Sequence, residues 1–293
     1  MFCSIRDCML TDTFPTPCAG LRHLNVDAVE IELTRSFEVL SMDSTEKVAL
    51  RSDEDALAYR KHLDSLDIQP VSFLTACDFS AGSFEDNVAW VTRAMELAAI
   101  LGMDNLRIDS AMAREMDLDF GARVTLFADG LGETLRRTAG LSVAMGIENH
   151  GFQGNNLAFL LNVFQRVGSK RLGLTMDTGN FYWRGYPLSE VYGILAVLAP
   201  YAKHTHLKNS HYPAEMRERT REAGWEYGTY VSPLDEGDVD HARVLGLLHA
   251  AGYAGDICIE DESLGKYPEG DARVKILERD VAHVKGLLTA VSG

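Results

Sequence analysis

The chain contains 293 residues, a length that suits one large domain or two small ones. Hydrophobic residues make up 46% of it, aromatic residues 9% and charged residues 24%, which excludes a disordered chain, a fibrous repeat and a small disulfide scaffold. The 28 Lys and Arg against 43 Asp and Glu give a net charge of −15. An acidic surface repels phosphate backbones unless basic residues gather on one face, and no basic run occurs, so we expect no nucleic-acid partner.

The cysteines and the N-terminus indicate a cellular compartment. Five cysteines are odd in number and lack metal-type spacing, so a reduced, cytoplasmic protein is the simplest interpretation. The opening MFCSIRDCMLTDTF carries polar residues inside any apolar core and does not resemble a secretory signal. No apolar run approaches the roughly 18 residues that a membrane helix needs. We therefore expect a soluble, cytoplasmic chain with no membrane partner.

Short β-rich runs alternate with segments of helical periodicity, and no linker rich in Pro, Gly or Ser divides the chain. The predicted strands begin with CSIRDCML at residue 3 and continue at 27–33, 69–76, 105–109, 141–150, 171–180, 202–209 and 255–262. The clearest amphipathic helices are predicted at 84–102, 122–140, 188–202, 239–253 and 272–288. Eight strand–helix units in a chain of this length indicate a single α/β domain over 1–293, a (β/α)8 TIM barrel. An open dinucleotide-binding sheet is disfavoured because no GxGxxG follows the first strand.

One connection interrupts this alternation. Residues 210–237 follow the seventh strand and contain four aromatic residues and three arginines. Connections this long are usually functional or interfacial. As the loop after a barrel strand, the segment would lie as a lid over the catalytic face, or it is a surface excursion or subunit contact.

Acidic and imidazole side chains stand where four consecutive predicted strands end. They are Glu148 and His150 on the fifth strand, Asp177 on the sixth, His204 and His206 on the seventh, and Glu260 on the eighth. Burying such groups is costly unless something pairs with them, and in a barrel these strand ends converge on one face. Two glutamates, one aspartate and one histidine form an oxygen-rich set that suits Mn²⁺, Mg²⁺ or Co²⁺, with Zn²⁺ also compatible.

The spacing of these motifs resembles the xylose isomerase-like TIM-barrel superfamily. The resemblance rests on ENH at 148–150, DTGN at 177–180, HTHLK at 204–208 and IEDE at 259–262. It extends over nearly the whole chain and is strongest from 141 to 262. The superfamily includes sugar isomerases, the D-tagatose 3-epimerase group, hydroxypyruvate isomerase, inosose dehydratase and endonuclease IV.

The resemblance implies roles for individual residues. The implied ligands of one divalent metal ion are Glu148, Asp177, His206 and Glu260, with His206 preferred over His204 because it directly precedes Leu-Lys. In epimerases of this kind the two ligand glutamates are also the acid/base pair, which makes Glu148 and Glu260 the expected catalytic residues. The expected substrate-binding residues are His150, Asn180 and Lys208. A structural role is the alternative for His150 and Lys208, the lysine by pairing with a nearby carboxylate.

Two departures from the family pattern narrow the function. No histidine lies between His62 and His150, and Asn180 stands where endonuclease IV and several epimerases have histidine. A multi-metal cluster and DNA repair are therefore not expected. The departure at Asn180 also indicates a substrate other than the one that the tagatose epimerases prefer.

These observations leave three hypotheses. The leading one is a divalent-metal-dependent isomerase or epimerase that acts on a small keto sugar or related polyol through proton abstraction and a metal-stabilised enediolate. The second is a lyase or dehydratase that uses the same site on an inosose-like or 3-keto-sugar substrate. The third is a non-catalytic sugar-binding barrel, which the intact ligand set disfavours. A homo-oligomer, a dimer or a tetramer, is compatible with each of them.

Overall fold

Eight parallel strands form the centre of the structure, a computed structural model that describes residues 1–110 and 112–292. In spatial order the strands are β12 (Asp256–Ile259), β1 (Phe2–Arg6), β2 (Ala28–Glu32), β5 (Gln69–Thr75), β6 (Asn105–Ile108), β7 (Ala144–Glu148), β8 (Leu172–Asp177) and β9 (Ala202–His206). A parallel bridge between Leu207 and Ile259 brings the two edge strands together, so the barrel is nearly closed. All six residues of β8 are buried, as expected for a parallel strand covered on both faces. The predicted α/β barrel with eight strands is confirmed.

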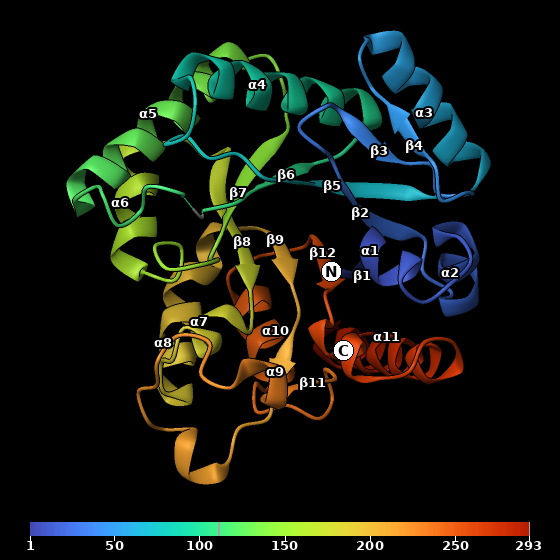
Figure 1. Cartoon of the computed structure of the whole chain (residues 1–293), viewed down its shortest axis with the longest axis vertical. Coiled ribbons are helices and arrows are strands. Elements are labelled where there is room, and N and C mark those ends of the chain that lie inside the picture. Colours follow the sequence, from blue (N-terminus) through green and yellow to red (C-terminus); the bar gives the residue numbers. More distant parts are fainter. Residues whose placement is uncertain (111, 293) are drawn as a thin grey trace.

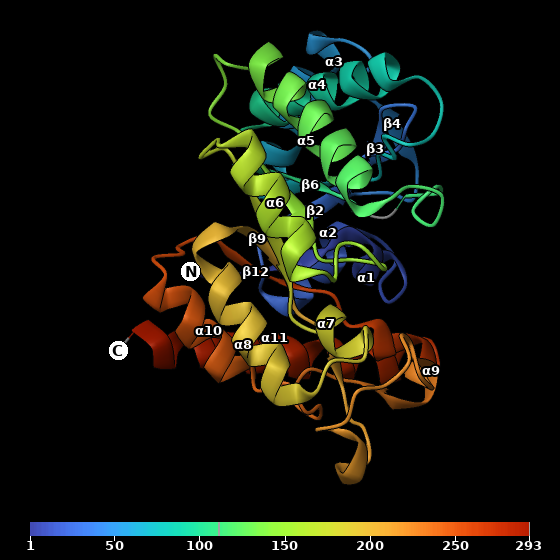
Figure 2. The same ribbon diagram turned by 90° about the vertical axis from the view of Figure 1, so that its left-hand side faces the viewer.

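Helices follow the strands and cover the outside of the barrel. In chain order they are α1 (Asp7–Thr11), α2 (Pro17–Leu24), α3 (Asp53–Ser65), α4 (Phe84–Leu101), α5 (Phe120–Arg137), α6 (Leu157–Val167), α7 (Asn180–Trp183), α8 (Leu188–Leu198), α9 (Tyr227–Tyr230), α10 (His241–Ala250) and α11 (Asp271–Ser292). Helices α3, α4 and α5 lie on one side of the strands, and α8, α10 and α11 lie on the opposite side (Figures 1 and 2). Among the described helices, none combines the length and the apolar character needed to cross a bilayer.

Side-chain caps begin several of these helices. The N-cap side chain accepts a backbone N–H three residues further on in α3 (Ser52), α4 (Ser83), α5 (Asp119), α6 (Asn156) and α10 (Asp240). Such caps satisfy amide donors that have no partner within the helix, so the sequence itself marks where each helix begins.

The N-terminal prediction needs one correction. Strand β1 ends at Arg6, and the residues after it form the short helix α1 instead of continuing the strand. Asp7 explains the change of direction, because its carboxylate accepts the backbone N–H of Glu32 at 2.9 Å and ties the strand end to β2. A hairpin of β3 (Glu38–Leu40) and β4 (Lys47–Ala49) was also not predicted, since three-residue strands are too short to show alternation.

The segment 210–237 has structure of its own. Ser210 belongs to β10 (Asn209–Ser210), which pairs with β11 (Val231–Ser232), and the 3₁₀ turn Ala214–Met216 and α9 lie between them. The guanidinium of Arg221 lies 4.4 Å from the ring of Tyr182 and 4.1 Å from that of Tyr212, which anchors the segment to α7. The lid function predicted for this segment stays a prediction.

Candidate metal centre

Four acidic or imidazole side chains meet at the carboxyl-terminal end of the barrel. Glu148 ends β7, Asp177 ends β8, His206 ends β9 and Glu260 directly follows β12. One candidate ligand atom of each lies within 4.8 Å of those of the others, and all four side chains are buried. Strand register helps to bring these side chains together, because Asp177 of β8 pairs with His206 of β9. The structure thus brings together the four residues that the family resemblance singles out.

Three of these side chains direct a polar atom without a hydrogen bond into the shared space, where the Lys208 ammonium lies within ion-pair distance of the two carboxylate oxygens among them. Asp177 Oδ2, His206 Nδ1 and Glu260 Oε2 form no hydrogen bond within the described part of the chain. Their other polar atoms are held in place: Asp177 Oδ1 accepts the backbone N–H groups of Gly179 and Asn180, each at 2.8 Å. Buried polar atoms almost always have a partner, so three such atoms at one point need an explanation. A divalent cation would satisfy all three, and carboxylate oxygens with one imidazole nitrogen are ligands that suit it.

The outer nitrogen of the candidate histidine ligand is held by a buried chain of hydrogen bonds. His206 Nε2 lies 2.8 Å from Glu30 Oε2, and His204 Nε2 lies 2.9 Å from Glu30 Oε1. His204 Nδ1 in turn lies 2.9 Å from Asp256 Oδ1. All of these side chains are buried. Carboxylates that hold the second nitrogen of a ligating histidine fix its tautomer and its ring orientation, so this chain leaves His206 Nδ1 as the atom that faces the other three residues.

Glu30, His204, His206 and Cys258 form a second cluster of metal-ligand types, but hydrogen bonding already accounts for it. Both ring nitrogens of His204 have carboxylate partners, and both carboxylate oxygens of Glu30 have imidazole partners. Burial raises the pKa of the Cys258 thiol to about 12, so this side chain is a neutral thiol at neutral pH when no cation is bound. The hydrogen bonds of this cluster hold His206 in place.

Two arginines balance the negative charge of the two glutamates. Arg107 on β6 donates to Glu148 Oε2, and Arg6 on β1 donates to Glu260 Oε1. Burial by itself would raise the pKa of Glu148, but the positive charge of Arg107 is the largest of the opposing causes, and that pKa lies well below its usual range. Glu148 is therefore a carboxylate at neutral pH.

The structure places the three predicted substrate-binding residues differently. Lys208 Nζ lies 2.5 Å from Glu262 Oε1, 3.0 Å from Asp177 Oδ2 and 3.3 Å from Glu260 Oε2, so the carboxylate pairing considered for this lysine is present. Asn180 Nδ2 donates to Glu148 Oε1 at 3.2 Å.

His150 lies outside this cluster. Its Nδ1 is 2.9 Å from Asp109 Oδ1, and its side chain is half-exposed. The hydrogen bond to Asp109 raises the pKa of His150.

Glu30, Arg107 and Arg6 were not predicted as site residues from the sequence. Each is a charged residue within or at the end of a short, mostly apolar strand, in AVEIE, NLRI and FCSIR. That pattern is the same signal that identifies Glu148 and Glu260, because a buried charge requires a partner. Applied to the early strands, it would have found all three.

The fold and this geometry define a class: a (β/α)8 barrel with a buried, oxygen-rich candidate cation site at the carboxyl ends of its strands. The family model described as xylose isomerase-like TIM barrel matches residues 19–285, and the chain belongs to this family. No curated protein gives a match.

Solved structures show the same fold at low sequence identity. A xylose isomerase domain protein from Alicyclobacillus acidocaldarius subsp. acidocaldarius has a TM-score of 0.72 at 14% identity, with 100% of both chains covered. A D-tagatose 3-epimerase-like protein has a TM-score of 0.70 at 17% identity, covering 100% of this chain and 98% of the other. An IOLI protein with a bound zinc atom has a TM-score of 0.67 at 16% identity, covering 99% and 98%.

Proposed function

We propose that this chain is a divalent-metal-dependent isomerase or epimerase of a small keto sugar or related polyol. The observation that carries the proposal is that both glutamates lie close to one candidate ligand atom. His206 Nδ1 lies 3.4 Å from Glu148 Oε1 and 3.2 Å from Glu260 Oε2. Membership of the family and the likeness to an epimerase-like structure support it.

The ion would be held by Glu148, Asp177, His206 and Glu260. When bound, a divalent ion supplies Lewis-acid polarisation of a carbonyl and a neighbouring hydroxyl, for which Mn²⁺, Mg²⁺ or Co²⁺ is proposed and Zn²⁺ is compatible. The bound zinc of the IOLI protein is consistent with a divalent ion in such a barrel.

The residues of the chain would then carry the proton. One glutamate, Glu148 or Glu260, takes the proton from the carbon beside the carbonyl, and the electron pair moves towards the carbonyl oxygen. The other glutamate, protonated beforehand from solvent, gives its proton to the opposite face of that carbon as the carbonyl re-forms, which inverts its configuration. Return to the former carbonyl carbon instead exchanges ketose for aldose. Asn180 and Lys208 would orient sugar oxygens, and His150 would act from the edge of the site.

A lyase is the second candidate, and Lys208 is the observation that favours it. After the same proton abstraction, loss of a hydroxyl from the next carbon as water needs a proton donor. Lys208 carries a buried ammonium group within 3.3 Å of Glu260 and 3.0 Å of Asp177. An ammonium group in that position could protonate the leaving hydroxyl, giving dehydration of an inosose-like or 3-keto-sugar substrate.

Exchange with solvent deuterium tests the proposal. The protein is loaded in turn with each of the four metal ions and incubated in D₂O with a panel of ketoses and inososes. NMR and mass spectrometry then locate any deuterium. Deuterium beside the carbonyl without loss of water supports the isomerase or epimerase, and loss of water supports the lyase. If the folded, metal-loaded protein binds a sugar but neither exchanges deuterium nor releases water, both enzyme hypotheses are contradicted. The chain is then a sugar-binding barrel.

Glutamine variants test the acid/base pair. Glu148→Gln and Glu260→Gln should each lower exchange by about 10²-fold or more, the range expected for a general acid or base. Glu278→Gln on the exposed face of α11 is the matched control, because it makes the same change at a half-exposed side chain. A Glu148→Gln protein that kept wild-type exchange with metal bound would contradict the assignment.

A further inference from the structure

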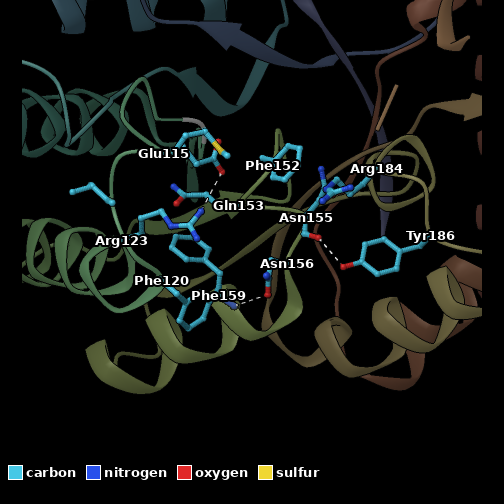
Figure 3. A pocket seen from close by; sticks show the side chains of 12 residues that line it. Glu115, Phe120, Arg123, Phe152, Gln153, Asn155, Asn156, Phe159, Arg184 and Tyr186 are labelled. Carbon is cyan, nitrogen blue, oxygen red and sulfur yellow. Dashed lines mark hydrogen bonds and ion pairs between the residues drawn. The ribbon is translucent and has the colours of Figure 1, made fainter. Parts of the chain in front are cut away.

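A cavity of about 270 Å³ opens beside the metal centre, at the same end of the barrel. It lies between the connection from β6 to α5, the connection from β7 to α6, and the turn between α7 and α8 (Figure 3). Because these segments follow the carboxyl ends of strands, the cavity belongs to the face on which barrels carry their ligand sites. We call it the Arg184 pocket.

Two arginines line this pocket, with one carboxylate near them. Arg184 has its guanidinium 4.0 Å from the ring of Phe152, and within the described residues no carboxylate lies within ion-pair distance of it. Arg123 has Glu115 at 3.9 Å, and its Nε is buried without a hydrogen-bond partner. Figure 3 shows both arginines and Glu115 around the same space. The pocket therefore holds one positive charge in excess, in a chain whose net charge is −15. An anion would compensate this charge, and arginine binds carboxylates with paired hydrogen bonds.

A buried acceptor in the same wall lacks a donor. Gln153 is 2% exposed, and its Nε2 donates to the carbonyl of Ser110 at 2.5 Å. Its Oε1 has no partner among the described residues. An unpartnered buried acceptor is costly, and a hydroxyl group of a ligand would satisfy it.

Aromatic side chains provide much of the apolar surface of the pocket. Phe159 and Tyr186 form part of the wall, and the rim carries Met116, Phe120 and Phe152, which are 84%, 37% and 48% exposed. Such a combination of apolar walls with a few convergent polar groups is typical of small-molecule sites. The flat faces favour a ligand whose body is a ring.

We propose that the Arg184 pocket binds a small cyclic carboxylate that carries a hydroxyl group. The carboxylate pairs with Arg184 while Arg123 adds positive charge to the same space, the hydroxyl donates to Gln153 Oε1, and the ring packs against the aromatic wall. None of the four candidate metal ligands lines this pocket, so binding does not require a metal ion.

The pocket is nevertheless connected to the metal centre. Ser110, which accepts from Gln153, donates through Oγ to the backbone carbonyl of Glu148 at 2.7 Å. An occupant that reorients Gln153 therefore acts on a residue that holds the strand end carrying Glu148.

Calorimetric titration of the metal-free protein tests the pocket directly. The probes are 3-hydroxybenzoate, its saturated-ring counterpart 3-hydroxycyclohexanecarboxylate, and the neutral 3-hydroxybenzamide. We expect saturable binding of at least one acid with a Kd below ~1 mM, and binding of the amide at least ~10-fold weaker. Arg184→Gln and Arg123→Gln should each weaken binding of the acid ~10-fold or more, and Arg184→Lys should restore part of it.

Arg166→Gln on α6 is the matched control, because Arg166 is half-exposed and does not line the pocket. It should bind the acid as the wild type does. Absence of saturable binding of both acids, equal affinity for acid and amide, or unchanged affinity in Arg184→Gln would each overturn the proposal. The proposal would also be overturned if a second copy of this chain occupied the pocket. Analytical ultracentrifugation would then show a dimer that Phe152→Ser converts to a monomer.

Discussion

Glu30 Oε2 lies 2.8 Å from His206 Nε2, across 176 positions of the sequence and between strands that are not neighbours in the barrel. This contact determines which nitrogen of His206 faces the three candidate ligand carboxylates. The other oxygen of Glu30 holds His204, which is itself held by Asp256. A buried chain of alternating acids and imidazoles thus supports the candidate metal centre.

Glu30→Gln should weaken binding of the divalent ion. Glutamine has one acceptor oxygen and cannot accept from both imidazoles, so the ring of His206 loses its orientation and part of its basicity. Mutation of such outer partners typically costs 10–100-fold in metal affinity, and we expect about that loss here. Titration with Mn²⁺ and Zn²⁺ against a chelating dye measures it. Glu32→Gln, the same change at an exposed position of β2, should keep wild-type affinity. Equal affinity in Glu30→Gln and the wild type would show that this contact does not position His206.

Local patterns in the sequence were enough to predict the barrel and the polar strand ends, and the family resemblance selected the four candidate ligands among them. Each strand is a short apolar run, and parallel strands bring their carboxyl ends to one face. The supporting residues depend on long-range contacts instead. Glu30 lies in a strand that the sequence predicts. Which distant side chain it contacts, however, depends on barrel closure and strand register. The Arg184 pocket depends on three separate loops, whose arrangement no local pattern specifies.

Lys208→Met should destabilise the metal-free protein more than the metal-loaded one. The lysine supplies the positive charge next to Asp177, Glu260 and Glu262, and removing one partner of a buried ion pair leaves carboxylates uncompensated. We expect a loss of about 3 kcal/mol in unfolding free energy in EDTA, and a smaller loss in Mn²⁺, because the ion replaces the missing charge.

Urea unfolding in EDTA and in excess Mn²⁺ measures this difference. Lys170→Met is the control, since Lys170 is exposed, and it should leave both values unchanged. An equal loss in both conditions would mean that Lys208 and the metal ion do not act on the same carboxylates.

Asp7→Asn should stabilise the protein at neutral pH. Burial raises the pKa of Asp7 from 3.8 to about 6. The hydrogen bond from the backbone N–H of Glu32 stabilises the carboxylate and lowers the pKa, but burial is the larger effect. The folded state therefore binds the proton more tightly than the unfolded state, and this contribution to stability is lost as pH rises from about 4 to 6. At pH 7 the ionised carboxylate lowers the free energy of unfolding by roughly 2–3 kcal/mol. Asparagine avoids this loss, and its side-chain oxygen still accepts the backbone N–H of Glu32.

Urea unfolding of the two proteins at pH 4, 5, 6 and 7 tests this prediction. The gain from Asp7→Asn should grow with pH over that window and level off above it. Asp27→Asn, at an exposed position, should follow the wild type throughout. A gain that does not vary with pH would assign the effect to packing instead of ionisation.

Gly173→Ala tests how closely the strand carrying Asp177 packs against the chain next to it. A methyl group at Gly173 of β8 would overlap the backbone carbonyl oxygen of Tyr201, immediately before β9, and would lie 2.9 Å from Cγ of Lys203. Backbone cannot move aside without shifting the register that sets Asp177 opposite His206, so we expect a loss of about 1–3 kcal/mol in urea unfolding and weaker metal binding. Gly193→Ala in α8 has nothing within 4 Å and removes a flexible residue from a helix interior, so it should add about 0.5–1 kcal/mol. If Gly173→Ala matched the wild type in stability and metal affinity, the close approach of these strands would not be what aligns the two ligands.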